Sequence, residues 1–243
     1  MKTTAILPCH NEEKTLRKVL SRLLILKKKK VVDDIITIND GSRDNTARIL
    51  QKYRIRTITH QKRKGKGKGM QEGARAAIKK GSSCLIFLDA DMQHNPMDIP
   101  KFLKKLKKAD FVLGSRYKKI SKKIIKIIHL NRMIANKTFC CLLEQLFDIK
   151  TTDPFCGFRA IKTRAYKEIN PKNKGYGIEM EMLIKAKIRH VKTAEISIPL
   201  VYFKKRKEIV KRSFVNMLDY NIRLIEDIIK KEKLEKKLKM YNN

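Results

Sequence analysis

Short apolar segments alternate along the first half of the chain with stretches whose apolar residues recur at helical spacing. The apolar segments at residues 3–7, 34–38, 55–59, 84–88 and 111–113 predict five strands. Helices are predicted over residues 12–26, from Asn45 and Thr46 to Tyr53, from the glycine-lysine loop at 62–69 to Lys80, and from Pro96 to Lys108. This β-α-β-α order predicts a parallel, doubly wound sheet.

The second half has a different pattern. Residues 118–147 predict a long helical stretch, interpreted as two helices, and residues 157–161 and 191–202 predict strands with a helix at 178–188 between them. From Ser213 onward a charged helix carries an apolar stripe of Phe214, Leu218, Ile222, Ile225 and Ile229. Because no Pro/Gly/Ser-rich linker separates the halves, we expect one α/β domain over residues 1–203 and a basic helical extension over 204–243.

Two carboxylates follow the apolar segment at residues 84–88 directly. Asp89 and Asp91 stand two positions apart, at the predicted carboxyl end of a buried strand. Open α/β sheets bind ligands at this end of their strands, and paired carboxylates suit a divalent cation that also holds substrate phosphates. An aspartate after a strand is also a common turn former or helix N-cap, so both interpretations stay open for this pair alone.

Length and cysteine content narrow the class of protein. The 243 residues include no apolar segment of transmembrane length, and the chain enters a strand pattern at once rather than a signal peptide. Five cysteines include no Cys-x-x-Cys pair, so we expect buried free thiols in a reducing compartment. These features predict a protein that is soluble or peripheral to the membrane, on the cytoplasmic side.

The formal net charge of +35 favours anionic partners such as nucleic acid, anionic lipid or nucleotide phosphates. The lysines are spread over the whole length, so a lysine-rich coding bias explains the excess equally well. No motif interleaves aromatic residues with the basic runs, and nucleic acid is therefore not an expected partner.

Six motifs follow the predicted strands in a fixed order. They read LPCHNEE at 7–13, NDGSRDNT at 39–46, GKG at 65–67, DADMQHNP at 89–96, GSRY at 114–117 and DPFCGFR at 153–159. In this order and spacing the chain resembles the family 2 glycosyltransferases, and among them the dolichyl- or polyprenyl-phosphate sugar transferases. The resemblance covers about residues 3–202 and implies a GT-A fold with a mixed, mainly parallel sheet flanked by helices.

For the donor, the resemblance implies a nucleotide sugar with a UDP or GDP leaving group. The segment of Pro8, His10, Asn11 and Glu12 would then meet the nucleoside, with Glu12 on the ribose side. The resemblance implies that Asp40 accepts a ring N–H of the base and that Lys66 lies beside the nucleotide. A helix-start acid for Glu12 and a turn residue for Asp40 are the structural alternatives, and the lysines around Lys66 read as solvated charge.

For catalysis, the resemblance assigns Asp91 to a Mg²⁺ or Mn²⁺ ion that bridges the diphosphate. Asp89 would lie near the ribose or the metal, and Gln93 would join the metal shell. Neutralising the charge of the departing nucleoside diphosphate is the main catalytic contribution expected of such a site. A single in-line displacement implies inversion at the anomeric carbon. His94 is interpreted as structural.

For the acceptor, the resemblance implies a polyprenyl (dolichyl-type) phosphate. Arg116 would face the acceptor phosphate or the diphosphate, and Arg132 and Asn136 fall where relatives bind the acceptor phosphate. A serine found in many relatives is Ala135 here, a departure that bears on acceptor identity. Asp153 is the predicted catalytic-side carboxylate, and it would act as a base if the acceptor were a hydroxyl.

A membrane contact is a further expectation. As a helix, residues 118–128 would place isoleucines on one face and lysines on the other, which is typical of an interfacial helix on an anionic leaflet and also of a helix packed on a sheet. The helix from Ser213 could dock on the core, the membrane or a second subunit. Two other functions stay open: transfer to a glycan or lipid hydroxyl by the same fold, and a basic nucleic-acid-binding protein without activity.

Overall fold

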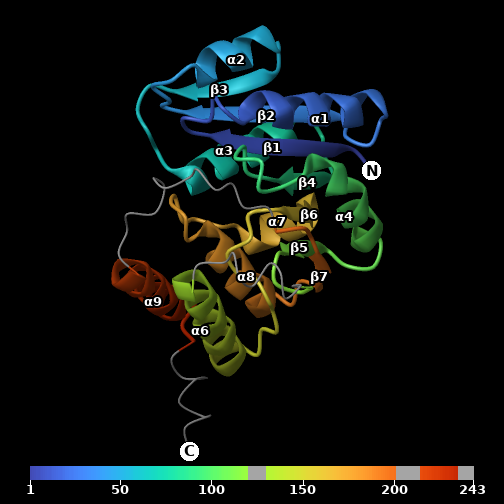
Figure 1. Ribbon diagram of the computed structural model, residues 1–243. Helices are drawn as coiled ribbons and strands as arrows, with labels where there is room; N and C mark the ends of the chain where they lie inside the picture. The colour runs from blue at the N-terminus through green and yellow to red at the C-terminus, as the bar shows by residue number, and fades with distance from the viewer. Residues whose placement is uncertain (120–129, 201–213, 235–243) are drawn as a thin grey trace, which may run out of the picture.

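The computed structural model describes residues 1–119, 130–200 and 214–234 (Figure 1). The strands are β1 (Thr3–Cys9), β2 (Asp34–Asp40), β3 (Arg56–His60), β4 (Cys84–Phe87), β5 (Phe111–Ser115), β6 (Arg159–Lys162) and β7 (Thr193–Ser197). The helices are α1 (Leu16–Lys28), α2 (Thr46–Lys52), α3 (Lys66–Lys79), the 3₁₀ turn η1 (Pro96–Asp98), α4 (Ile99–Leu106), α6 (Leu130–Phe147), α7 (Thr163–Ile169), α8 (Ile178–Ile188) and α9 (Phe214–Lys231).

The seven strands form one mixed sheet in the order β3-β2-β1-β4-β6-β5-β7. Every neighbouring pair is parallel except the two pairs that involve β6, which runs antiparallel to both β4 and β5. Six strands therefore place their carboxyl ends at one edge of the sheet. The chain moves outward from β1 to β3 and then returns to place β4 on the other side of β1, so a topological switch point lies between β1 and β4.

Each face of the sheet is covered by its own set of helices. Alternate residues of β4 point to opposite faces, since Leu85 and Phe87 join one core cluster and Cys84 and Ile86 join the other. The first cluster lies under α3, α6, α7, α8 and α9, and the second lies under α1, α2 and α4. This two-sided burial explains why the parallel strands read as continuous apolar runs in the sequence.

The structure confirms the mixed, mainly parallel sheet and differs from the predicted elements at several ends. Helix α1 begins at Leu16 rather than at residue 12, because residues 12–15 form a turn in which Leu16 N donates to Glu12 O. Helix α3 begins at Lys66, within the predicted loop. Strand β7 covers only Thr193–Ser197 of the predicted 191–202, and the short helix α7 was not predicted at all.

The last described helix, α9, packs on the core. Leu224, Ile225 and Ile228 are buried in the cluster beneath α8, whereas Ile222 is 44% exposed. Figure 1 shows α9 beside α6 and α8, on the side of the molecule away from α1 and α2. The stripe predicted from the sequence was therefore right for Ile225 and wrong for Ile222, which faces outward.

The cysteines are reduced, and three of them are buried: Cys9, Cys84 and Cys156. Burial raises the pKa of the Cys84 and Cys156 thiols to about 12. Of the two on α6, Cys140 is partly buried and Cys141 is exposed. The prediction of free thiols is confirmed. The prediction that the thiols are buried is correct for three of the five cysteines.

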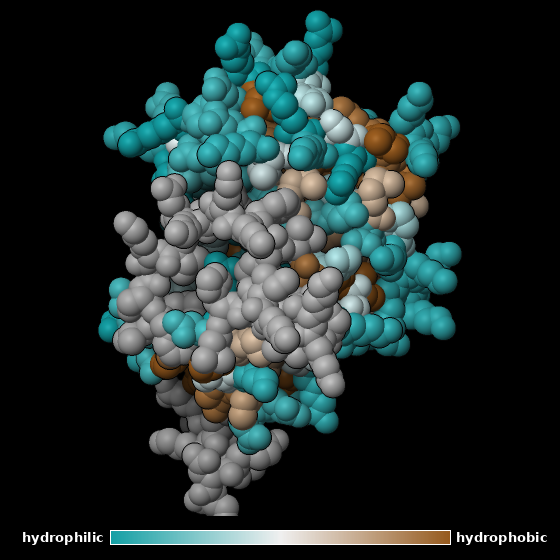
Figure 2. All heavy atoms as spheres, viewed as in Figure 1, coloured by the Kyte–Doolittle hydropathy of each residue, from teal (hydrophilic) through white to brown (hydrophobic). Residues whose placement is uncertain are grey.

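On the face that Figure 2 shows, hydrophilic side chains cover most of the upper part, where α1 and α2 lie. In the described part of the chain, no helix is both long enough and apolar enough to cross a bilayer. Most of the segment predicted as an interfacial helix, 118–128, lies outside the described residues.

Candidate active site

The candidate site lies at the sheet edge where β1 and β4 end. The motifs at 7–13, 39–46 and 89–96 follow β1, β2 and β4, and parallel pairing brings their beginnings to the same edge. Because β6 is antiparallel, its amino end and the preceding segment 153–158 arrive at this edge too. The reversal of β6 therefore explains how segment 153–158 meets the motif at 89–96, more than sixty positions earlier in the chain.

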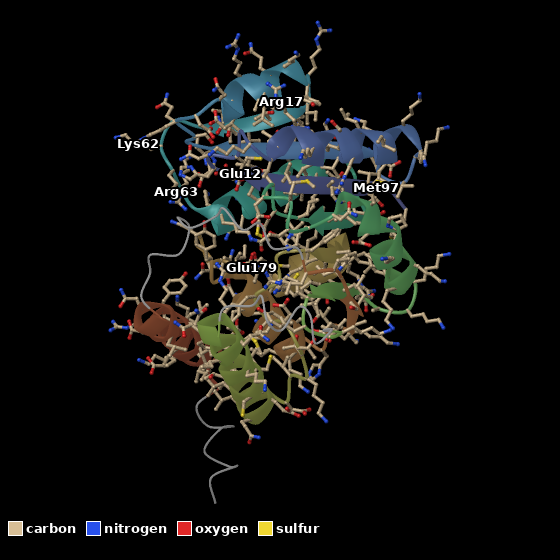
Figure 3. The ribbon with its side chains drawn as sticks, in the orientation of Figure 1. Glu12, Arg17, Lys62, Arg63, Met97 and Glu179 are labelled. Atoms are coloured by element: carbon tan, nitrogen blue, oxygen red, sulfur yellow. The ribbon has the colours of Figure 1, made fainter. Side chains whose placement is uncertain are left out.

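The segments after β1 and β2 are joined by side-chain hydrogen bonds. Arg43 N donates to Asn11 Oδ1 at 2.8 Å, and Glu12 N donates to Thr46 Oγ1 at 2.8 Å. The His10 ring contacts the backbone carbonyl of Asp40 through Nδ1 at 2.8 Å. Pro8 lies within β1 itself. The residues predicted to meet the nucleoside thus form one braced wall, and Figure 3 shows Glu12 in it, above Glu179.

Asp40 ends β2 with both carboxylate oxygens engaged. Oδ1 lies 2.7 Å from His60 Nδ1 and accepts from Lys64 N at 2.7 Å, and Oδ2 accepts from Gly65 N at 2.9 Å. Burial acts to raise the pKa of this carboxyl, but the hydrogen bonds outweigh it and lower the pKa below its ordinary value. Asp40 therefore anchors the segment that leads into α3, and a carboxylate with about four lone-pair positions keeps room for one more donor.

His60 and Glu72 extend this anchor. The His60 ring is buried at the end of β3 and lies 2.6 Å from Glu72 Oε2 through Nε2, on the far side from Asp40. Glu72 in turn pairs with Lys68 at 3.3 Å. The ring joins β2 to α3 and fixes the direction of the Asp40 carboxylate. Neither His60 nor Glu72 was predicted as a site residue.

Lys66, in the first turn of α3, connects two carboxylates from distant parts of the chain. Its Nζ lies 2.6 Å from Asp89 Oδ1 and 2.6 Å from Glu179 Oε1. Asp89 is partly exposed at the end of β4, whereas Glu179 is buried at the start of α8. Burial acts to lower the pKa of Lys66, but the two carboxylates raise it well above its ordinary value. Lys66 is thus held as an ammonium ion at the sheet edge.

Asp89 is correspondingly an ionised carboxylate. Burial acts to raise its pKa, but the Lys66 ammonium dominates and lowers it to about 2. The backbone N of Asp89 donates to Nδ1 of the buried His94 at 3.1 Å. Burial lowers the pKa of His94, so the neutral ring accepts this hydrogen bond. This agrees with the structural role predicted for His94.

Asp91 and Gln93 follow in an irregular turn. Asp91 Oδ1 accepts from Gln93 N at 3.0 Å, and Met92 between them adopts a left-handed conformation with φ 64°. Both side chains are partly exposed. The two carboxylates of the DAD motif therefore have different partners: Asp89 pairs with Lys66, and Asp91 accepts from the backbone N of Gln93.

Arg116 follows β5 and forms a bidentate ion pair with Asp153. Nε lies 2.7 Å from Oδ2, Nη2 lies 2.9 Å from Oδ1, and the backbone N of Arg116 also donates to Oδ2 at 3.0 Å. The Asp153 side chain is fully buried, whereas that of Arg116 is 16% exposed. The buried carboxylate thus holds a guanidinium whose outer side reaches the surface.

The residues predicted on α6 have different surroundings. Asn136 is buried, and its Nδ2 donates to Thr152 O at 2.8 Å, which ties α6 to the residue before Asp153. Among the described atoms its Oδ1 has no hydrogen-bond partner. Arg132 lies one helical turn earlier on α6 and is partly exposed. The structure thus brings Asn136 to the Asp153 segment and leaves Arg132 near the surface.

Glu179 is a site residue that the sequence left open. Glu179 and Glu181 open a predicted helix on different faces, which fits two acids favoured by the helix dipole and also leaves one of them free to approach the site. In the structure Glu181 accepts from Lys172 N and Asn173 N, whereas Glu179 pairs with Lys66. Figure 3 shows Glu179 on α8, below Glu12.

A divalent cation fits the donor set but is not enclosed by it. Among the residues the structure describes, no three His, Cys, Asp or Glu side chains gather at metal-binding spacing. Asp89, Asp91 and Gln93 offer oxygen ligands only, which is the chemistry of Mg²⁺ and Mn²⁺. Such ions usually take one or two carboxylates and complete their shell with water and substrate phosphates. The residues present therefore fit a metal that arrives with a phosphate-bearing substrate.

The fold and this sheet edge define a GT-A glycosyltransferase. The model of the family described as glycosyl transferase family 2 matches residues 4–170, and the chain belongs to that family. A solved structure of glucosyl-3-phosphoglycerate synthase from Mycobacterium tuberculosis, in complex with Mn²⁺, UDP and phosphoglyceric acid, aligns with a TM-score of 0.69. It is 19% identical and covers 94% of this chain and 78% of its own, so it supports the fold.

Two curated relatives carry lipid-phosphate names. A UDP-N-acetylglucosamine–dolichyl-phosphate N-acetylglucosaminyltransferase of Methanococcus voltae is 28% identical over 81% of this chain and 84% of its own length. A dolichol-phosphate mannosyltransferase of Pyrococcus furiosus is 30% identical over 79% of this chain and 54% of its own length. The resemblance to dolichyl- and polyprenyl-phosphate sugar transferases is confirmed at the level of the family and its named relatives.

Proposed function

We propose that this glycosyltransferase moves one sugar from a UDP- or GDP-linked donor to a polyprenyl phosphate at the cytoplasmic face of the membrane, with inversion. The observation that carries the proposal is the pairing of charges along one sheet edge. Carboxylates at Asp89 and Asp91 follow β4, and a guanidinium at Arg116 follows β5. The names of the relatives from M. voltae and P. furiosus support a dolichyl-phosphate acceptor.

On the donor side, the braced wall after β1 and β2 would bind the nucleoside. Pro8, His10, Asn11 and Glu12 line this wall, and Asp40 would accept the ring N–H of the base with its remaining lone pair. Lys66 carries a fixed positive charge beside Asp89, where a diphosphate oxygen would meet it. The wall orients the donor, and the cation counters the charge that grows on the leaving group.

A bound Mg²⁺ or Mn²⁺ ion would be held by Asp91, with Asp89 and Gln93 beside it. When bound, the ion neutralises the diphosphate and so makes it a better leaving group. The chain's own part is to present oxygen ligands from one irregular turn, which Asp91 closes by accepting the Gln93 N–H.

On the acceptor side, Arg116 would hold the phosphate that attacks the anomeric carbon. A phosphate is already an anion, so its oxygen needs little help from a general base. Asp153 suits this chemistry as a support, because both of its oxygens are bound to Arg116 and its side chain is fully buried. Arg132 and Asn136 are proposed beside the same phosphate. Asn136 Oδ1, which has no hydrogen-bond partner among the described atoms, is an acceptor and would contact the phosphate only through a protonated oxygen.

A hydroxyl acceptor would need a different arrangement. Asp153 would then have to take a proton, and in the structure its oxygens are occupied by the Arg116 guanidinium and backbone N. The ion pair thus favours a phosphate acceptor over a glycan or lipid hydroxyl. The basic surface, with the formal net charge of +35, supports attachment to an anionic leaflet that carries such an acceptor.

A donor and acceptor screen tests this proposal. Purified protein with Mg²⁺ or Mn²⁺ receives radiolabelled UDP- and GDP-sugars, with and without a short polyprenyl phosphate, and label entering the organic phase is counted. We expect metal-dependent labelling with one donor only. Donor hydrolysis without lipid labelling would move the acceptor to a hydroxyl. No use of any donor, together with tight and salt-sensitive nucleic-acid binding, would contradict the assignment of an enzyme.

A further inference from the structure

We propose that Glu179 is a positioning residue, which holds the Lys66 ammonium so that one of its N–H groups points at the diphosphate of the donor. The inference rests on the proposed function, because it assumes that a nucleoside diphosphate binds at this sheet edge. It adds a residue from the second half of the chain, on α8, to a donor site whose other residues follow β1, β2 and β4.

The burial of Glu179 is the first argument. The side chain is 3% exposed, and its Oε1 lies 2.6 Å from Lys66 Nζ. A buried carboxylate is costly unless it is paired, so the ammonium and this carboxylate stabilise each other. Glu179 lies on α8, as Figure 3 shows, and Lys66 begins α3. The pair therefore joins the starts of two helices that are far apart in the sequence.

The rigidity of the backbone beneath Glu179 is the second argument. The carbonyl of Glu179 accepts from Nη1 of Arg159 at 2.5 Å. The same fully buried guanidinium donates to Cys156 O and Pro154 O, each at 2.7 Å. Arg159 thus fixes the start of α8 to the segment that leads into β6. The backbone carbonyl of Glu179 is therefore tied, through one buried guanidinium, to two carbonyls of the segment before β6.

The position of the ammonium is the third argument. Lys66 Nζ lies 2.6 Å from Asp89 Oδ1 and 2.6 Å from Glu179 Oε1. The contact with Glu179 is a pairing of charges, since its Oε1 has no hydrogen-bond partner among the described atoms. The two carboxylates come from different elements and together fix where the positive charge lies. The Lys66 side chain is 14% exposed, so its ammonium stays within reach of a phosphate oxygen, the acceptor that such a charge prefers.

Gly157 shows how closely this arrangement is packed. A Cβ added at Gly157 would lie 2.7 Å from Lys66 Nζ and 2.7 Å from Asp89 Oδ2. No side chain fits at this position without displacing the ion pair. The absence of a side chain here therefore lets Lys66 and Asp89 meet. Glu179 is the more deeply buried of the two carboxylates that pair with Lys66.

The consequence concerns donor binding rather than folding alone. Without the carboxylate at position 179, the ammonium has Asp89 as its remaining charged partner in this group and turns towards it. That movement withdraws the ammonium from the diphosphate and also engages the Asp89 carboxylate more fully. We expect weaker binding of any nucleoside diphosphate, with little dependence on which base it carries.

A double-mutant cycle on the full-length chain tests this inference. The dissociation constants of UDP and GDP with Mn²⁺ are measured by calorimetry for the wild type, Glu179→Gln, Lys66→Met and the double variant. We expect Glu179→Gln to weaken binding by about 10–100-fold, the range typical when a charged ligand loses its outer hydrogen-bonded partner. In the Lys66→Met background the same substitution should change the dissociation constant little, because its effect passes through Lys66. Glu168→Gln, at an exposed site on α7, is the matched control.

The outcomes separate this inference from the proposed function. An equal loss in both backgrounds, or none in either, would overturn the role of Glu179 while donor binding stands. A wild-type protein that binds neither nucleotide would overturn the proposed function and this inference with it. If Glu179→Gln fails to fold, Glu179→Asp keeps the charge and shortens the arm, and we expect an intermediate dissociation constant at an unchanged melting temperature. Wild-type affinity in that variant would contradict the geometric argument.

Discussion

Buried carboxylates in this protein act mainly by holding cations. Asp153 holds Arg116 with two oxygens, and Glu179 holds Lys66 with one. In both pairs the acid is almost completely buried and the base is more exposed. The acids therefore set the direction of the positive groups, and in the proposed function the positive groups meet the phosphates of donor and acceptor.

Replacing Asp153 by asparagine tests whether the buried acid orients the Arg116 guanidinium. We expect the KM for a polyprenyl phosphate to rise and the overall transfer rate to fall by about 10–100-fold, because Arg116 loses its charged partner. The affinity for the donor should stay unchanged, since Asp153 contacts none of the donor-side residues described above. Steady-state kinetics with varied acceptor measures this, with the exposed Asp219→Asn on α9 as control. A large loss of donor affinity instead would contradict the assignment of Asp153 to the acceptor side of the site.

Asp40 predicts a pH dependence of stability. Its folded pKa lies below the value of about 3.9 expected in the unfolded chain, so its contribution is present above about pH 4 and is lost as the pH falls through the folded pKa. Asp40→Asn should cost about 1–3 kcal/mol of unfolding free energy at neutral pH. The difference from wild type should shrink below about pH 4. Urea unfolding across this range measures it; a difference that grows on acidification would contradict the prediction.

At the scale of elements, α9 belongs to the core cluster that α8 covers. Ile225 is 4% exposed and Ile222 is 44% exposed on the same helix. Ile225→Ala should therefore lower the unfolding free energy by about 2–4 kcal/mol, whereas Ile222→Ala should stay within about 0.5 kcal/mol of wild type. Chemical unfolding of the two variants compares them directly. Equal effects would contradict the packing of α9 with Ile225 towards the core and Ile222 towards solvent.

The strands were predictable because each is buried on both faces. Continuous apolar runs such as that of β4 end in polar motifs, and the parallel order follows from alternation with helices. The reversal of β6 was not predictable, since its direction depends on pairing with β4 and β5, which are 75 and 48 positions earlier at their starts (159 − 84 and 159 − 111). Helix α7 is short, and its seven residues carry too few apolar positions to show a period.

The candidate site was predictable where a residue follows a strand directly. Asp40, Asp89 and Arg116 all stand at such ends, and the structure places all of them at one edge. His60 was missed because its partners, Asp40 and Glu72, lie 20 and 12 positions away, and a single histidine before a lysine-rich loop does not report them. The pairing of Glu179 was missed because Lys66 lies 113 positions earlier (179 − 66), and no local pattern reports a contact over that distance.

Over the whole molecule, one sheet edge collects residues from both halves of the chain. In the proposed function the first half supplies the residues that bind donor and metal, and Asp153 and Glu179 of the second half hold Arg116 and Lys66. The division of the chain into residues 1–203 and a basic extension at 204–243 stays a prediction, as does the membrane contact of residues 118–128. The central claim is that this edge transfers a sugar with the aid of a metal held at Asp91.

The most direct test of that claim is the transfer of labelled sugar to a polyprenyl phosphate by the wild type and by Asp91→Ala, each with and without Mn²⁺. We expect transfer by the wild type that requires the metal, and a loss on the order of 10²–10³-fold in the variant. Asp219→Ala, at an exposed position on α9, should transfer normally. An Asp91→Ala variant that transfers at the wild-type rate without metal would contradict the account.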